Sequence, residues 1–229
     1  MKRVINGLVA DVRFQFSQGF YFIYLILSFI YVSVIYQTGE KVAVILTPVL
    51  LYFDPAMVGF MFTGGMVMLE KQQGLTSYIG ITPFKTLEYI AVRTISMAGL
   101  ALFASLIICI AVWKPFNILT LMTGIILVSA FHTLLGLHAS SKCRSMNDYF
   151  IRMIPYMLII ILPVLGFLDS DWFVILRYFP GFAGLRIILN AFNNGIEAHI
   201  LQDISVMVVW ITAILTPVAR KFDKEMIRG

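Results

Sequence analysis

The sequence has little charge, and this absence already excludes most protein classes. Only 13% of its 229 residues are Asp, Glu, Lys or Arg, whereas a typical soluble domain has roughly 25%. Hydrophobic residues make up 60% of the chain and the mean hydropathy is +0.90. A soluble globule of this size cannot hide so much apolar sequence, because its surface needs polar cover. The composition therefore excludes a soluble enzyme and a disordered chain, and it predicts an integral membrane protein.

The chain also has few cysteines and lacks short alternating segments. Two cysteines, Cys109 and Cys143, cannot form a disulfide framework. We interpret Cys109 as a small buried residue and Cys143 as a cytosolic thiol. A transmembrane barrel would show segments of roughly 10 residues with alternating hydrophobicity. Long apolar runs take their place here, and they predict an all-α membrane fold.

Catalytic motifs are missing as well. The sequence contains no Gly-x-x-x-x-Gly-Lys-Ser/Thr phosphate loop, no His-Glu-x-x-His and no Gly-x-Ser-x-Gly. Its three histidines, His132, His138 and His199, follow no familiar metal-binding spacing. We expect no catalytic residue, no metal site and no cofactor in this chain. If transport uses ATP, the ATP and Mg²⁺ must be bound by a separate ATPase.

The apolar runs predict six transmembrane helices in one domain that covers residues 1–229. A helix needs roughly 20 apolar residues to cross a bilayer. The predicted spans are residues 20–36, 55–70, 89–113, 117–138, 151–168 and 201–217. Six spans place both termini on one side, and that side carries 13 of the 17 Lys and Arg residues. The positive-inside rule makes it the cytoplasm. Topology thus explains the net charge of +5, and we expect no nucleic-acid partner.

The second apolar tract is too long for one simple span, and Asp54-Pro55 offers a point to divide it. Asp is a good N-cap, and Pro is favoured at the first helical position. This reading starts the second span at Pro55 and makes residues 42–53 an interfacial or re-entrant segment on the outer side. Asp54 has a second interpretation, a polar group that lines a transport pathway, because acids inside a membrane are costly.

Residues 1–18 have the pattern of an amphipathic helix on the membrane surface. Its apolar positions fall on one helical face: Val4, Ile5, Leu8, Val9, Val12 and Phe16. Arg3 and Arg13 fall on the opposite face. A basic amphipathic helix of this kind lies flat on the cytoplasmic leaflet and contacts membrane lipid. It is either a simple anchor or a lever that also touches a cytoplasmic partner.

The first cytoplasmic loop, residues 71–88, carries signals for a short helix between two long ones. Gly74 is suited to end the second span, and Thr82-Pro83 to begin the helix that feeds the third. Leu75, Tyr78 and Ile79 are apolar groups on an exposed turn, and such groups favour a protein partner.

A family resemblance appears at this loop. The string EKQQGLTSYIGITPFKTLEYIAVRTIS resembles the segment after the second helix of ABC-2-type transporter permeases, although Leu75 and Thr76 stand in reversed order. The string WFVILRYFPGFAGLRIILNAF resembles the outer Phe-Pro region of that family before its last helix. The layout is most similar to small six-span permeases that pair with an ATPase in bacterial drug and natural-product export.

The resemblance implies a role for this loop and a set of partners. The loop would hold the coupling helix that docks on the ATPase, around Gly74 to Thr82, and Glu70 would lie at the hinge between the second span and that helix. The residues expected to couple to the ATPase are Glu70, Gly74, Leu75, Thr76, Tyr78, Ile79, Thr82 and Pro83. The N-terminal helix would be the connecting helix. The complex would contain two ABC ATPase subunits and a second permease copy or a paralogue, in a bacterial plasma membrane. It would export an amphipathic or lipophilic small molecule or peptide by alternating access.

The outer region, residues 169–200, is unusually long for a connection. The resemblance implies that short helices here cap the pathway, with Phe179, Pro180 and Phe182 at the break. An interfacial helix without a gating role is the alternative. Arg177 and Arg186 are expected to pair with nearby acids.

Two further groups have alternative interpretations. Met57, Phe60 and Met61 join Asp54 as candidates for lining a pathway, or they face lipid. Small residues, Gly59 and Thr63 on the second span and Gly136 and Ser140 on the fourth, allow close helix packing within one subunit or at a dimer seam. Rival functions are a permease for haem-related, lipid or glycan cargo, a stand-alone channel, and a non-transporting scaffold.

Overall fold

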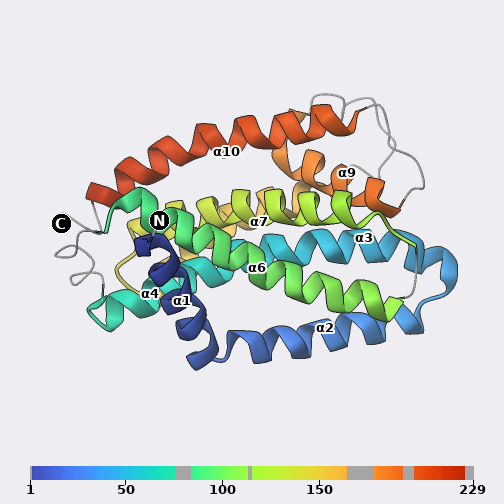
Figure 1. Cartoon of the computed structure of the whole chain (residues 1–229), viewed down its shortest axis with the longest axis horizontal. Coiled ribbons are helices and arrows are strands. Elements are labelled where there is room, and N and C mark those ends of the chain that lie inside the picture. Colours follow the sequence, from blue (N-terminus) through green and yellow to red (C-terminus); the bar gives the residue numbers. More distant parts are fainter. Residues whose placement is uncertain (1, 76–83, 113–114, 164–177, 193–198, 225–229) are drawn as a thin grey trace.

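A computed structural model describes residues 2–75, 84–112, 115–163, 178–192 and 199–224, and these ranges contain helices and no strand. Figure 1 shows long helices lying side by side, with α1 crossing one end of the bundle. The elements are α1 (Lys2–Ser17), α2 (Phe20–Gln37), α3 (Glu40–Met57), η1 (Val58–Phe62), α4 (Thr63–Gln72), α6 (Thr86–Val112), α7 (Ile118–Ser141), α8 (Met146–Ile161), α9 (Pro180–Phe192) and α10 (Ile200–Phe222).

Five helical segments are long and apolar enough to cross a membrane within the described ranges. They are α2, the continuous segment α3–η1–α4, α6, α7 and α10. The predicted multi-pass helical architecture is therefore confirmed. The predicted span 151–168 overlaps α8, but its residues 164–168 lie outside the described ranges.

The expected division of the second tract at Asp54-Pro55 is wrong. One helical segment runs from Glu40 to Gln72, so residues 42–53 are part of the same helix. Pro48 and Pro55 both lie inside it. The fixed φ of proline is compatible with a helix, and in an apolar bundle the neighbouring helices compensate for the missing N–H. At 33 residues the segment is about 50 Å long, which exceeds the roughly 30 Å hydrocarbon core.

A π-helical turn, η1, widens this segment and is held by close contacts. A Cβ placed on Gly59 would lie 2.7 Å from the Ser129 carbonyl oxygen of α7, and one on Gly136 would lie 2.6 Å from the Phe60 carbonyl oxygen. Only glycine permits this backbone approach. The Tyr149 hydroxyl of α8 donates to the same Phe60 carbonyl over 2.9 Å. Gly59 and Gly136 thus serve packing within one subunit.

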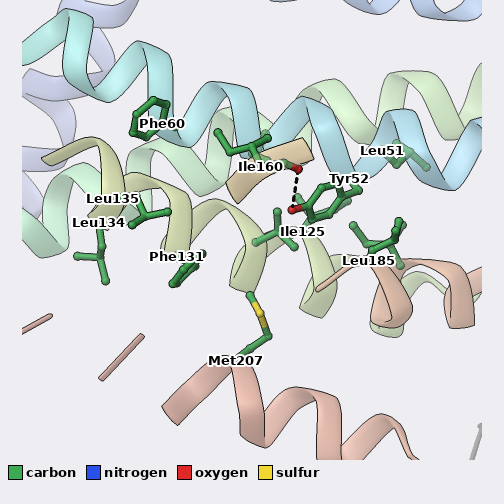
Figure 2. Packing of buried hydrophobic residues seen from close by; sticks show 14 of the residues in the cluster. Leu51, Tyr52, Phe60, Ile125, Phe131, Leu134, Leu135, Ile160, Leu185 and Met207 are labelled. Atoms are coloured by element: carbon green, nitrogen blue, oxygen red, sulfur yellow. Dashed lines mark hydrogen bonds between the residues drawn. The ribbon is translucent and has the colours of Figure 1, made fainter. Parts of the chain in front are cut away.

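Helix α7 lies in the centre of the bundle and packs against α3, α6, α9 and α10. Most residues of its second half are buried, so its surroundings are protein rather than lipid. Figure 2 shows Tyr52 of α3, Leu185 of α9 and Met207 of α10 packing around this helix. The Tyr52 hydroxyl also donates to the Ile160 carbonyl of α8 over 3.5 Å.

The elements converge at the end of the bundle where α1 lies. The last turns of α4, α7 and α10 and the first turn of α6 all lie at this end (Figure 1). The charged residues that form the candidate site lie near this end, in α1, in the last turn of α4 and in the first three turns of α6.

Candidate functional site

The inner face of α1 is polar and packs on α6. Gly7, Asp11 and Gln15 follow each other at intervals of four, which places them on one helical face. Asp11 and Gln15 are buried. A Cβ on Gly7 would lie 3.0 Å from the Val92 side chain, so α1 approaches α6 closely there. This face was not recognised in the sequence, where the apolar pattern alone defined the helix.

The outer face of α1 carries the predicted apolar residues. The side chains of Ile5, Val9 and Phe16 are each more than half exposed, at 54%, 60% and 64%. Such exposure is unfavourable in water and suits a helix that lies against lipid.

Arg93 of α6 is the centre of the site. Arg93 is only 1% exposed. Its guanidinium forms ion pairs with Asp11 of α1, at 2.7 Å, and with Glu70 of α4. The Tyr89 hydroxyl donates to the second oxygen of Glu70 over 2.6 Å and accepts from Arg93 over 3.0 Å. Three elements that are far apart in sequence are therefore joined through one cation.

Two further polar side chains complete the surroundings of Asp11. The Ser96 hydroxyl donates to its carboxylate, and the Gln15 amide donates to the same carboxylate over 3.0 Å. Burial raises the pKa of the Asp11 carboxyl, and the Arg93 guanidinium opposes part of that rise. We refer to these six residues, Asp11, Gln15, Glu70, Tyr89, Arg93 and Ser96, as the charge cluster.

The charge cluster contains a buried triad of one guanidinium and two carboxylates, Arg93, Asp11 and Glu70. Groups of this kind contribute little net stability when complete, but removing the guanidinium leaves two buried carboxylates unpaired and costs about 3–5 kcal/mol. The cluster therefore opposes any relative movement of α1, α4 and α6 that would separate the charges. Forces on one of these elements reach the other two.

Lys71 anchors the same turn of α4 on its other side. Its ammonium donates to three carbonyl oxygens at the end of α7: Ser140 at 3.2 Å, Ser141 at 2.9 Å and Cys143 at 2.7 Å. A cation at a helix C-terminus is favourable because the last carbonyls lack helical donors and carry partial negative charge. Two neighbouring residues, Glu70 and Lys71, thus join α4 to opposite parts of the bundle.

The end of α10 joins this region through α6. The Thr86 hydroxyl donates to Asp223 over 2.7 Å. The rings of Tyr89 and Phe222 stack with centroids 5.0 Å apart. Tyr89 therefore belongs both to the charge cluster and to the contact with α10.

The predicted coupling residues are only partly within the described ranges. Glu70 lies in the charge cluster. Helix α4 ends at Gln72, and Gly74 follows with a φ of 70°, a conformation that favours glycine and suits the predicted helix end. Leu75 is 36% exposed. Thr76, Tyr78, Ile79, Thr82 and Pro83 lie outside the described residues.

The four pathway candidates are buried or partly buried, and their role in a pathway stays a prediction. Phe60 is fully buried and packs against the rings of Tyr149 and Tyr156. Met57 and Met61 are partly buried against the same core. Asp54 is 2% exposed and lies inside α3, so its interpretation as an N-cap is wrong.

Toward the end of the bundle away from α1, the predicted break at Phe179-Pro180 is the start of α9 (Figure 1). Pro180 is its first residue, and the Phe179 carbonyl accepts from the Ala183 N–H over 3.1 Å. Phe182 is buried, and the Phe179 ring meets the edge of Trp210 of α10. A capping role for these residues stays a prediction.

Arg186 has the acidic partner expected for it. Its guanidinium forms an ion pair with Asp203 of α10, which is 1% exposed. This pair joins α9 to α10. Arg177 lies outside the described residues.

The fold and the site together define a class: a multi-pass helical membrane protein whose helices are tied by charges at one end. Comparison of the sequence with known families makes this more specific. The chain belongs to the fluoroquinolones export permease protein family, whose model matches residues 2–228. It is therefore a drug-export permease by family.

Two similar proteins are the fluoroquinolones export permease proteins of the Mycobacterium tuberculosis strains CDC 1551 / Oshkosh and ATCC 25618 / H37Rv. Each is 27% identical over 173 residues, which cover 75% of this chain and 73% of the relative. No solved structure matches the chain.

Proposed function

We propose that this chain is the membrane subunit of an ATP-driven ABC exporter of the ABC-2 type. Two copies of a separate ATPase subunit bind ATP and Mg²⁺, and the permease works as a homodimer or with a paralogue. ATP binding draws the ATPases together and switches the pathway from inward to outward access. The chain itself carries no catalytic residue.

The charge cluster is the observation that carries this proposal. It lies where α4 ends and α6 begins, on either side of the predicted coupling helix in residues 71–88. A force on that loop acts on Glu70 and Lys71 first. Glu70 passes it to Arg93 and Asp11, so the two flanking helices and α1 respond as one unit.

The topology that fits this mechanism has six spans. The predicted span 151–168, which begins within α8, is the one span beyond the five long apolar segments, and it returns the chain to the outer side. The charge cluster and both termini then face the cytoplasm, as the distribution of Lys and Arg requires. Helix α1 lies on the inner leaflet of the bacterial plasma membrane with Ile5, Val9 and Phe16 in lipid.

The cargo is an amphipathic or lipophilic small molecule, and a fluoroquinolone is the first to test. The names of the two mycobacterial relatives, fluoroquinolones export permease proteins, support this choice. Rival cargoes are a haem-related compound, a lipid or a glycan. A stand-alone channel or a scaffold is a weaker rival, because neither needs a charge cluster beside a docking loop.

Co-purification tests the proposal. The chain is expressed with the ATPase encoded beside its gene and purified through a tag on the permease. The test variant is Leu75→Asp with Tyr78→Asp, which places charge on the apolar docking turn. The control is Asn147→Asp, an exposed position in the first turn of α8, where an acid is favourable.

The wild type and the control should retain the ATPase, and the double variant should lose it. Retention by all three would move the docking site away from this turn, to α1. Absence of the ATPase from the wild type would refute the exporter complex and favour a channel or scaffold.

A further inference from the structure

The continuous helical segment that carries Glu70 carries a second buried acid, Asp54, sixteen residues earlier and outside the charge cluster. We propose that Asp54 of α3, with the hydroxyls of Tyr24 and Ser28 of α2, forms a binding site for a monovalent cationic group. The group is either the protonated amine of a transported molecule or an inorganic cation. This inference rests on the proposed transport function and names the chemistry of its cargo or co-ion.

Asp54 is buried without the partners that a buried acid needs. Only 2% of the residue is exposed, and its Oδ2 has no hydrogen-bond partner among the described residues. The residue lies close to the middle of the segment Glu40–Gln72, which is long and apolar enough to cross a membrane, so a spanning orientation of this segment places Asp54 deep in the bilayer. An acid at that depth is costly, and such residues usually serve a pathway or a ligand.

Helix α2 turns a polar face to this carboxyl. Tyr24, Ser28 and Tyr31 are spaced at i, i+4 and i+7, so they share one side of the helix. The hydroxyls of Tyr24 and Ser28 are buried and have no partner in the described part of the chain. The phenol groups of Tyr24 and Tyr31 lie within electrostatic range of the Asp54 carboxyl.

The backbone of α3 is irregular at the same place. Pro55 follows Asp54 and has no N–H to donate to the carbonyl of Leu51 one turn earlier. The π-helical turn η1 begins only four residues after Asp54. Turns of this kind occur frequently at functional sites.

These groups have the chemistry of a cation site. A carboxylate and two hydroxyls offer oxygen acceptors, and the three side chains include no positive charge that would neutralise the acid. In an apolar interior a cationic group gains strongly from such oxygens, because they have no water to compete with it. A cationic group could reach this site only if α2 separated from α3. Helix α2 is the less buried of the two spans: 22% of the residues in its most apolar stretch are buried, against 56% for the segment Glu40–Gln72.

Binding to the purified permease, without any ATPase, tests the site. The chain in lipid nanodiscs is dialysed to equilibrium against norfloxacin, a fluoroquinolone with a secondary amine, and against N-acetyl norfloxacin, in which that nitrogen is neutral. A second arm titrates NaCl against choline chloride and records thermal unfolding. The variants are Asp54→Asn and Tyr24→Phe, and the matched control is Glu40→Gln, an exposed acid on the same helix.

If the site takes an organic amine, norfloxacin binds more tightly than its acetyl derivative. Asp54→Asn then weakens norfloxacin binding roughly ten- to hundredfold, the range for losing a charged hydrogen bond. Tyr24→Phe weakens it severalfold, and Glu40→Gln leaves it unchanged. If the site takes an inorganic cation, Na⁺ raises the unfolding temperature of the wild type and of Glu40→Gln, and this effect is lost in Asp54→Asn.

Equal norfloxacin binding and an equal Na⁺ response in the wild type and Asp54→Asn would overturn the inference. Because this assay contains no ATPase, such a result would leave the exporter proposal intact. Absence of the ATPase from the wild type in the co-purification assay would refute the exporter and leave the measured cation affinity standing.

Discussion

Two buried acids of one continuous helix meet opposite environments. Glu70 forms an ion pair with Arg93 and accepts from Tyr89. Asp54, sixteen residues earlier, has a buried oxygen without a partner in the described residues. Both are largely buried, at 8% and 2% exposed. The difference indicates that ion pairs hold the segment Glu40–Gln72 in place at the end close to α1, whereas the acid near its middle has no cation paired with it among the residues that the structure describes.

The two environments suit two tasks. A complete triad transmits force, because separating its members exposes unpaired charge to an apolar interior. An uncompensated acid has the opposite property, since it gains when a cation arrives and the gain depends on the conformation that admits it. The same helix, α3–η1–α4, carries both, with the π-helical turn η1 between them.

The largest expected effect is at the centre of the triad. Arg93→Met leaves Asp11 and Glu70 without their cation, and we expect the free energy of unfolding to fall by about 3–5 kcal/mol. Denaturation in mixed detergent micelles, followed by circular dichroism, measures this loss.

The neutral triad is the control for that experiment. Adding Asp11→Asn and Glu70→Gln to Arg93→Met removes every charge, and most of the stability should return. A triple variant as unstable as Arg93→Met would show that packing, and not unpaired charge, explains the loss.

Glu70→Gln should have a smaller effect. The substitution keeps the shape of the side chain but removes the negative charge that pairs with Arg93 and accepts from Tyr89. We therefore expect the free energy of unfolding to fall by about 1–3 kcal/mol in the same assay. Glu70→Asp retains the charge and is the matched comparison. A Glu70→Gln protein as stable as the wild type would mean that Asp11 alone satisfies Arg93.

Lys71→Met should lower the free energy of unfolding by a smaller amount, about 1–2 kcal/mol. The substitution removes the cation from three carbonyl oxygens at the end of α7. Lys71→Arg supplies donors again and should recover part of the loss. Hydrogen exchange of the amides around Ser140 to Cys143 would locate the effect, and unchanged exchange there would contradict it.

Asp54→Asn should have the smallest effect on stability, within about 1 kcal/mol of the wild type and in the stabilising direction. It removes a buried charge that has no cation beside it, so little interaction is lost. A loss as large as that of Glu70→Gln would show that Asp54 has a structural partner after all. The contrast between the two acids would then fail.

Sequence reasoning predicted the local features of the fold better than its long-range contacts. Helix periodicity and length identified α1, α2, α6, α7 and α10, and turn chemistry identified Gly74 and Pro180. Each of these depends on a few neighbouring residues. The same local logic failed at Asp54-Pro55, where an N-cap signal lies inside a helix because packing in the bundle overrides it.

The charge cluster was missed because its members lie far apart in the chain. Asp11, Glu70 and Arg93 come from three elements, and no short pattern connects them. One signal was present: Arg93 is a cation within a predicted apolar span, and such a residue needs an acid. A second signal was the four-residue interval between Asp11 and Gln15, since a polar pair on one face of α1 implies a buried polar partner.

The central claim, that the charge cluster transmits force from the docking loop to the helices, is tested by one ratio. Proteoliposomes containing the permease and its ATPase are assayed for norfloxacin moved per ATP hydrolysed, in wild type and Glu70→Gln. The account predicts that Glu70→Gln keeps the bound ATPase and its hydrolysis but lowers the ratio roughly tenfold, within the usual range of coupling energies. An unchanged ratio in the folded, ATPase-bound variant would contradict it.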